Sequence, residues 1–155
     1  MKVSTGIALL SLHIFVPVAR AQGPDNDIDA VAAALPAIMS KVPLGPTAVV
    51  YNNRTADLSK RLAVKTGKTF EPESNKLDCR KDSATSSDVC SLKNVASLVN
   101  LGGVILGDET ATVYFNIEIP SGSVTVPIEH YLYAVDLKHS GAIWTVIRVR
   151  SVAIS

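Results

Sequence analysis

The strictest pattern in the chain is an unbroken alternation of apolar and polar residues from Ala111 to Ile119. The apolar set is Ala111, Val113, Phe115, Ile117 and Ile119, and Thr112, Tyr114, Asn116 and Glu118 stand between its members. Successive side chains of a β-strand point to opposite faces, so the pattern predicts a strand with one buried and one solvated face. A strand of this kind needs neighbours, and half-burial is typical of antiparallel sheets.

Three further segments around this one have strand character. Gly107-Asp108 is a tight-turn signal, and Pro120–Ser123 and His139–Gly141 are short polar links. Together these features predict a four-stranded antiparallel meander, with strands at about 98–106, 111–119, 126–138 and 142–154.

The residues before position 95 have helical spacing instead. A first helix is expected from an N-cap at Asp27, and Pro36 should kink or split it because the proline ring clashes with the preceding turn. A second helix should end at Thr66, before Gly67, and a short strand is expected at Thr47–Tyr51. The predicted fold class is therefore α+β, with N-terminal helices packed on the C-terminal meander.

Two cysteines, Cys79 and Cys90, flank a stretch almost without apolar residues, within a polar excursion from about Glu71 to Ser91. A pair of this kind most often forms a disulfide in an oxidising compartment. Closing a loop of about 12 residues should stabilise the fold by roughly 3 kcal/mol in the chain-entropy model. A metal or redox site is the rival interpretation, but the chain has no C-x-x-C motif and no nearby histidine.

The first 21 residues have the layout of a secretory signal peptide. Lys2 precedes an apolar stretch from Thr5 to Val18, and Ala19-Arg20-Ala21 has the small-x-small form of a cleavage site. The stretch is shorter than the roughly 20 residues of a membrane span. We therefore expect cleavage after Ala21, a secreted or periplasmic protein without a membrane anchor, and a single domain over residues 22–155.

Composition excludes some classes of partner. Loss of the leader would remove Lys2 and Arg20, which leaves 13 basic residues against 14 acidic ones. Nothing in this balance suggests a nucleic-acid partner, which needs a clustered basic surface. No motif indicates a cofactor or a metal. Asn53-Arg54-Thr55 is an N-glycosylation sequon, which has meaning only in a eukaryotic source.

The last hairpin gathers the candidate ligand-binding residues. If His139–Gly141 is a three-residue loop, His130 lies opposite Arg150, and Asp136 lies opposite Trp144. One face of the sheet then carries His130, Asp136, Trp144, Arg148 and Arg150, with Tyr114 and Glu118 adjoining. This face could hold an anionic ligand or serve acid–base chemistry. The alternative is a solvated face whose arginine stems cover Trp144.

The opposite face is the predicted core wall, made of Val113, Phe115, Ile117, Tyr133 and Ile147. Along the strand, His130 and Asp136 are six residues apart, roughly 20 Å at about 3.3 Å per residue. They cannot form a catalytic dyad with each other, so any catalytic pairing needs a residue from elsewhere in the fold.

The order of helices and meander resembles the nuclear transport factor 2-like superfamily of cone-shaped α+β domains. The closest local likeness is Ser140–Ile147, which is similar to a Gly-x-x-Trp-x-Val type of final hairpin. A cystatin-like arrangement, with one helix across a four-stranded sheet, fits nearly as well. The superfamily includes enzymes, ligand binders and assembly modules, so the resemblance implies a fold and leaves the function open.

Three hypotheses about function follow. The leading one is a non-catalytic binding or interaction module for a small ligand or another protein, because no catalytic motif is present. The alternative is a small hydrolase or isomerase that uses His130 with a carboxylate or tyrosine. A third is an inhibitor or partner-binding domain that acts through the Cys79–Cys90 loop and Pro120–Ser123.

Overall fold

The computed structural model of the chain describes residues 25–154 apart from 44, 53 and 122–126. The predicted leader and its cleavage site lie outside the described residues, as do Asn53 of the sequon and part of the Pro120–Ser123 link. The described part has the α+β class that the sequence predicted. Its helices are α1 (Asn26–Met39), α2 (Ala56–Thr66) and the 3₁₀-helix η1 (Glu73–Lys76).

The main sheet extends beyond the four predicted strands. Its members are β1 (Thr47–Tyr51), β2 (Glu71–Pro72), β5 (Ser97–Leu106), β6 (Thr110–Pro120), β7 (Ile128–Ser140) and β8 (Ile143–Ile154). The order is β2-β1-β5-β6-β7-β8, and neighbours from β5 to β8 pair antiparallel. β1 pairs in parallel with both β5 and β2. The sequence predicted β1 but did not place it in this sheet.

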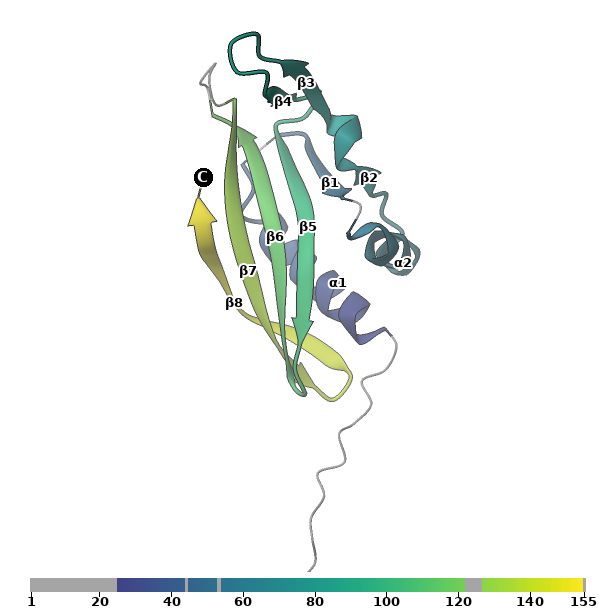
Figure 1. Cartoon of the computed structure of the whole chain (residues 1–155). Helices are drawn as coiled ribbons and strands as arrows, with labels where there is room; N and C mark the ends of the chain where they lie inside the picture. Colours follow the sequence, from purple (N-terminus) through teal and green to yellow (C-terminus); the bar gives the residue numbers. More distant parts are fainter. Residues whose placement is uncertain (1–24, 44, 53, 122–126, 155) are drawn as a thin grey trace, which may run out of the picture.

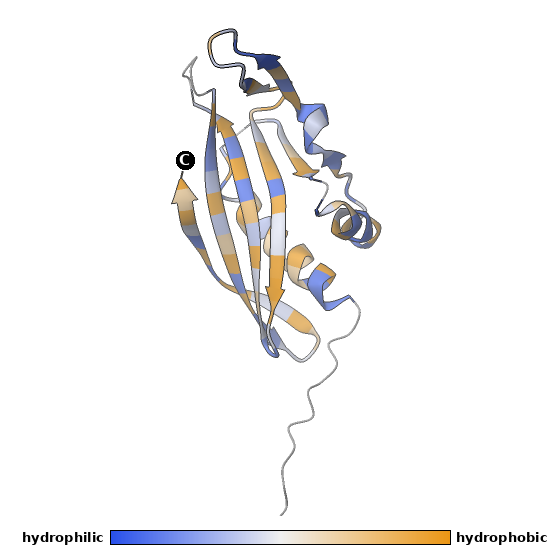
Figure 2. Ribbon diagram, viewed as in Figure 1, coloured by the Kyte–Doolittle hydropathy of each residue, from blue (hydrophilic) through white to orange (hydrophobic). Residues whose placement is uncertain are grey.

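One face of the sheet carries the core, and α1 lies along it (Figure 1). The helix packs against all four strands from β5 to β8. Val113, Phe115 and Ile117 are buried in this core, as predicted, and Tyr133 packs against it. The alternation that predicted β6 appears as stripes of hydrophobic and hydrophilic residues along the strands in Figure 2.

Pro36 does not split the first helix into two. α1 runs from Asn26 to Met39 with Pro36 inside it, and the residue before the helix is Asp25, not Asp27. Pro36 is exposed, whereas Leu35 and Ile38 beside it are buried against the sheet. A carbonyl that loses its partner on the solvent side can bond to water, and packing of the buried side holds the helix together.

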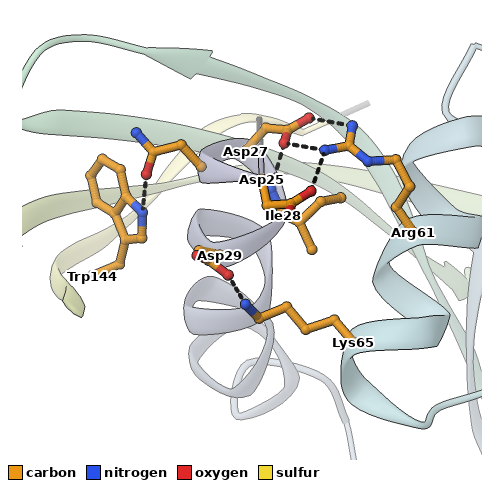
Figure 3. Close-up of polar contacts among 8 residues, drawn as sticks. Asp25, Asp27, Ile28, Asp29, Arg61, Lys65 and Trp144 are labelled. Carbon is orange, nitrogen blue, oxygen red and sulfur yellow. Dashed lines mark hydrogen bonds and ion pairs between the residues drawn. The ribbon is translucent and has the colours of Figure 1, made fainter. Parts of the chain in front are cut away.

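Charged side chains join α1 to α2 (Figure 3). Arg61 of α2 forms ion pairs with Asp25 at 3.2 Å and Asp27 at 3.0 Å, and Lys65 pairs with Asp29. α2 ends as predicted, because Gly67 adopts the left-handed conformation with a φ of 65°.

The two cysteines form the predicted disulfide, but the segment between them is more regular than a loop. β3 (Leu77–Lys81) and β4 (Asp88–Leu92) make a separate two-stranded antiparallel sheet, in which Cys79 lies directly opposite Cys90. We call residues 73–92, which comprise η1, β3 and β4, the disulfide excursion. It lies at one end of the main sheet, where β4 approaches β6 and β7 (Figure 1).

The predicted register of the last hairpin is wrong. Ser140 pairs with Ile143, so the connection is the two-residue turn Gly141-Ala142. A regular hairpin with this turn would place Ile147 opposite Asp136. A bulge at Ile147 instead brings Arg148 opposite Asp136, and a second bulge occurs at Val152. Ile147, expected in the core wall, is therefore 59% exposed.

Candidate functional site

The face of the sheet turned away from α1, which we call the outer face, carries two polar clusters. Pairing between β6 and β7 places Thr112 opposite Asp136 at one end and Glu118 opposite His130 at the other. The sequence-predicted site is thus divided, as the distance along β7 required. Asp136, Arg148 and Arg150 come together, His130 belongs to the second cluster, and Trp144 belongs to neither.

The Arg–Asp cluster consists of Thr112, Asp136, Arg148 and Arg150. Arg148 donates from Nε to Asp136 at 2.7 Å, and Arg150 donates from Nε at 3.0 Å and from a terminal nitrogen at 3.4 Å. Thr112 adds a hydroxyl hydrogen bond of 3.0 Å to the same carboxylate. The bulge at Ile147 creates this arrangement, because it places Arg148 opposite Asp136.

The electrostatics of this cluster favour the ionised carboxylate. Hydrogen bonds from Arg150 and then Arg148 lower the pKa of Asp136 to about 2, and the Thr112 hydroxyl acts in the same direction. The same contact raises the pKa of Arg150. Two guanidinium groups share one carboxylate, so the Arg–Asp cluster keeps one net positive charge at neutral pH.

Trp144 points away from this cluster, into the core side of the sheet. Its side chain is among the buried hydrophobic residues, and its indole nitrogen donates to Asn26 Oδ1 of α1 at 3.0 Å (Figure 3). The ring of His139, predicted to be a loop residue, lies 4.6 Å from the Trp144 ring between centroids. The expectation that Trp144 shares a face with Asp136 was wrong because it depended on the three-residue loop.

The second cluster, which we call the Glu118 cluster, consists of Glu73, Asn116, Glu118 and His130. Asn116 Nδ2 donates to Glu118 Oε1 at 3.3 Å, and His130 Nδ1 lies 3.7 Å from the same oxygen. Glu73 of η1 is a further acidic neighbour, whose charge and hydrogen bonding act to raise the pKa of the Glu118 carboxyl. The sequence placed Glu118 adjoining the face that carries His130 but gave no sign of Glu73.

Burial changes the chemistry of Glu118. The residue is 2% exposed, and desolvation, followed by the charge and hydrogen bond of Glu73, raises its pKa to about 7. The alternation along β6 predicted a solvent-exposed side chain for Glu118. The pattern describes the sheet alone and not what packs on it. β4 of the disulfide excursion approaches β6 and β7, and Leu98, directly opposite Glu118, is also buried.

One buried polar atom near the Glu118 cluster lacks a hydrogen-bond partner. Asn100 lies opposite Asn116 across β5 and β6, and its Oδ1 atom is buried without a partner. Buried polar groups are normally hydrogen-bonded, so Asn100 Oδ1 is an exception in this part of the sheet.

The edge of the sheet is unusually apolar. Six large hydrophobic residues are exposed in the described chain, and four of them belong to β8, the last strand of the sheet: Ile143, Ile147, Val152 and Ile154. An edge strand that exposes several apolar side chains can contact another molecule.

Fold and clusters together define a small α+β domain with a polar outer face and an apolar edge. No protein-family model, curated protein or solved structure matches the chain. Over the described ranges, no group of three or more His, Cys, Asp and Glu side chains is arranged to hold a metal ion. Nor does this part of the chain contain a helix long and apolar enough to cross a membrane.

Proposed function

We propose that this chain is an exported, non-catalytic binding module that recognises a protein partner through β8 and the Arg–Asp cluster. One observation carries the proposal: the strand that exposes four large aliphatic side chains also holds two arginines that share a single carboxylate. The Cys79–Cys90 disulfide supports export, because such bonds persist in oxidising compartments.

The net charge of the cluster is available to a partner. Arg148 is 67% exposed at its side chain and uses Nε for Asp136. Among the described residues, its two terminal nitrogens have no hydrogen-bond partner. An arginine side chain in this state can bind a carboxylate through two parallel hydrogen bonds.

The chemistry of β8 indicates what the partner should present. Ile147 stands immediately before Arg148, so a matching surface would place a carboxylate beside apolar side chains. The bulges at Ile147 and Val152 interrupt the regular backbone of the edge, which opposes continuous strand addition. Recognition by side chains of a folded partner or a short acidic–apolar peptide is therefore favoured.

Binding of defined peptides tests the proposal. We expect peptides with Asp or Glu between Leu and Ile to bind more tightly than the same peptides with Asn or Gln, as measured by fluorescence anisotropy. Arg148→Gln should weaken binding about fivefold or more, because it removes the exposed guanidinium. Lys60→Gln, which removes an exposed positive charge from α2, is the matched control and should change little.

Two results would contradict this function. The first is equal binding of the acidic and amide peptides, since the Arg–Asp cluster would then confer no charge selectivity. The second is an equal effect of Arg148→Gln and Lys60→Gln, which would indicate that general charge, and not β8, attracts the peptides.

A second candidate function rests on the contact between His130 and Glu118. A half-exposed histidine 3.7 Å from a carboxyl whose pKa is about 7 could exchange protons with a substrate, as in a small hydrolase or isomerase of the nuclear transport factor 2-like superfamily. Turnover of an ester, glycoside or phosphate panel that is lost in His130→Ala would favour this function. Absence of turnover across the panel would favour the binding module.

A further inference from the structure

The outer face of the sheet is buried at the start of β5 and exposed at its end. Leu98, near the start of the strand, is fully buried, whereas Ile105, near its end, is 62% exposed. Ile105 belongs to the outer face because it lies opposite Thr112. The turn after β5 lies beside the turn between β7 and β8, at the end of the sheet away from the disulfide excursion (Figure 1). Another molecule can therefore reach this end of the face.

The register places Ile105 and Arg148 in a single row across the sheet. Ile105 lies opposite Thr112. Thr112 lies opposite Asp136, which in turn lies opposite Arg148. Neighbouring strands are about 4.8 Å apart, so three spacings separate the two ends of the row by roughly 14 Å. The row thus carries an exposed aliphatic side chain at one end and an exposed cation at the other.

Acidic side chains follow Ile105 closely in the chain. Asp108 and Glu109 lie in the turn between β5 and β6, and both are exposed. In the described part of the chain, neither side chain forms an ion pair. The chain itself therefore presents the combination expected of its partner, which is a carboxylate beside an apolar side chain.

We propose that the partner recognised by β8 and the Arg–Asp cluster is a second copy of this chain, an inference that rests on the proposed function. A two-fold axis parallel to the strands, between β6 and β7, would make β5 of each copy face β8 of the other. Ile105 then meets Ile147 of the second copy, and Arg148 meets its Asp108–Glu109 turn. Because Ile105 and Arg148 lie in one row, a single rotation makes both contacts, and each occurs twice.

The distribution of charge favours this pairing. The Arg–Asp cluster keeps one net positive charge, and the exposed Lys138 of β7 adds another at the same end of the sheet. Across the two-fold axis these cations face the acidic turn of the second copy, so opposite charges meet on both sides. Stacking of β8 on β8 would instead bring Arg148 and Arg150 against the same residues of the second copy, and like charges would repel.

The dimer should be weak. The contact is about 14 Å wide and extends over about five residues of each strand, or roughly 17 Å. Such an area is well below the roughly 800 Å² that each partner buries in an interface of standard size. We therefore expect monomer and dimer to be equally populated near about 100 μM, with less dimer at high salt.

Charge reversal in two variants tests the dimer. Glu109→Arg and Arg148→Glu each bring like charges together across the axis, so neither variant should dimerise alone. An equal mixture of the two should dimerise, because both contacts then join opposite charges. Sedimentation velocity of the purified proteins at about 10 to 500 μM measures this. Lys60→Glu, which reverses an exposed charge on α2, is the matched control and should dimerise like the unaltered protein.

Two results would overturn the dimer. The first is an unaltered protein that stays monomeric at about 500 μM in low salt. The second is a mixture of Glu109→Arg and Arg148→Glu that dimerises no more than either variant alone.

Peptide binding separates this inference from the proposed function. Glu109→Arg keeps Ile147 and Arg148, so it should bind the acidic peptide at least as tightly as the unaltered protein. A monomeric protein that still prefers acidic peptides to amide peptides would overturn only the dimer. Loss of both dimerisation and peptide preference would overturn the proposed function as well.

Discussion

The two polar clusters of the outer face place acidic side chains in opposite electrostatic situations. Asp136 lies beside two arginines near the edge of the sheet, and its pKa falls to about 2. Glu118 is buried towards the other end of the outer face, with Glu73 as an acidic neighbour, and its pKa rises to about 7. Both residues occupy polar positions in alternating strands, so the neighbours brought by β8 and η1, and not the sheet itself, decide which charge state is stable.

The largest expected effect concerns the pH dependence of stability. Because the folded pKa of Glu118 lies above its ordinary value of 4.5, the folded state binds the proton more tightly than the unfolded state. Stability should therefore fall as the pH rises from about 4.5 to 7, by at most about 3 kcal/mol. Urea unfolding at pH 5 and pH 8 measures this loss, and Glu118→Gln should remove most of it. An equal loss of unfolding free energy between pH 5 and pH 8 in the unaltered protein and in Glu118→Gln would show that Glu118 does not cause the pH dependence.

The Arg–Asp cluster should give a pH dependence of stability with the opposite sign. Because the pKa of Asp136 is lower in the folded state, the ionised carboxylate stabilises the fold at pH values above its ordinary pKa of 3.8. This contribution is lost as the pH falls towards about 2. Asp136→Asn should cost about 1 kcal/mol at pH 7, a figure reduced for the exposure of both arginines. Urea unfolding measures the cost. If Asp136→Asn raised stability at neutral pH, repulsion or desolvation, and not the arginines, would dominate this cluster.

The smallest expected effect is that of Arg148→Gln on stability, and it tests whether this residue serves binding and not the fold. Arg148→Gln should destabilise the fold by less than about 0.5 kcal/mol, because Arg150 and Thr112 still hold Asp136 and the removed side chain is largely exposed. Thermal unfolding at neutral pH checks this value. A large destabilisation would show that Arg148 serves the fold, and its effect on peptide binding could then no longer be assigned to a direct contact.

Much of the fold could be predicted because local pattern and structure agree. The alternation from Ala111 to Ile119 defines β6, Gly67 ends α2, and the Cys79–Cys90 pair forms a disulfide. The register of β8 could not be predicted, because no residue type marks the bulge at Ile147. That single extra residue determines which side chain meets Asp136, whereas the two-residue turn determines which face receives Trp144.

The candidate site could be predicted only in part, because its contacts also depend on the register of β8. Asp136, Arg148 and Arg150 do meet, although through pairings different from those expected. The Glu118 cluster depends on Glu73, which lies 45 residues away in a polar segment without strand or helix periodicity. Long-range placement of such a segment leaves no trace in local pattern, so the burial of Glu118 could not be predicted.

The parallel pairing of β1 with β5 has a consequence for the kinetics of folding. Thr47 meets Ser97 across 50 positions of the sequence, whereas each hairpin from β5 to β8 joins strands that follow each other in the chain. Contacts between distant segments carry a larger entropic cost of chain closure and slow the search for the native topology. We therefore expect the C-terminal hairpins to assemble early during refolding, with β1 and β2 docking onto the edge of β5 as a late event.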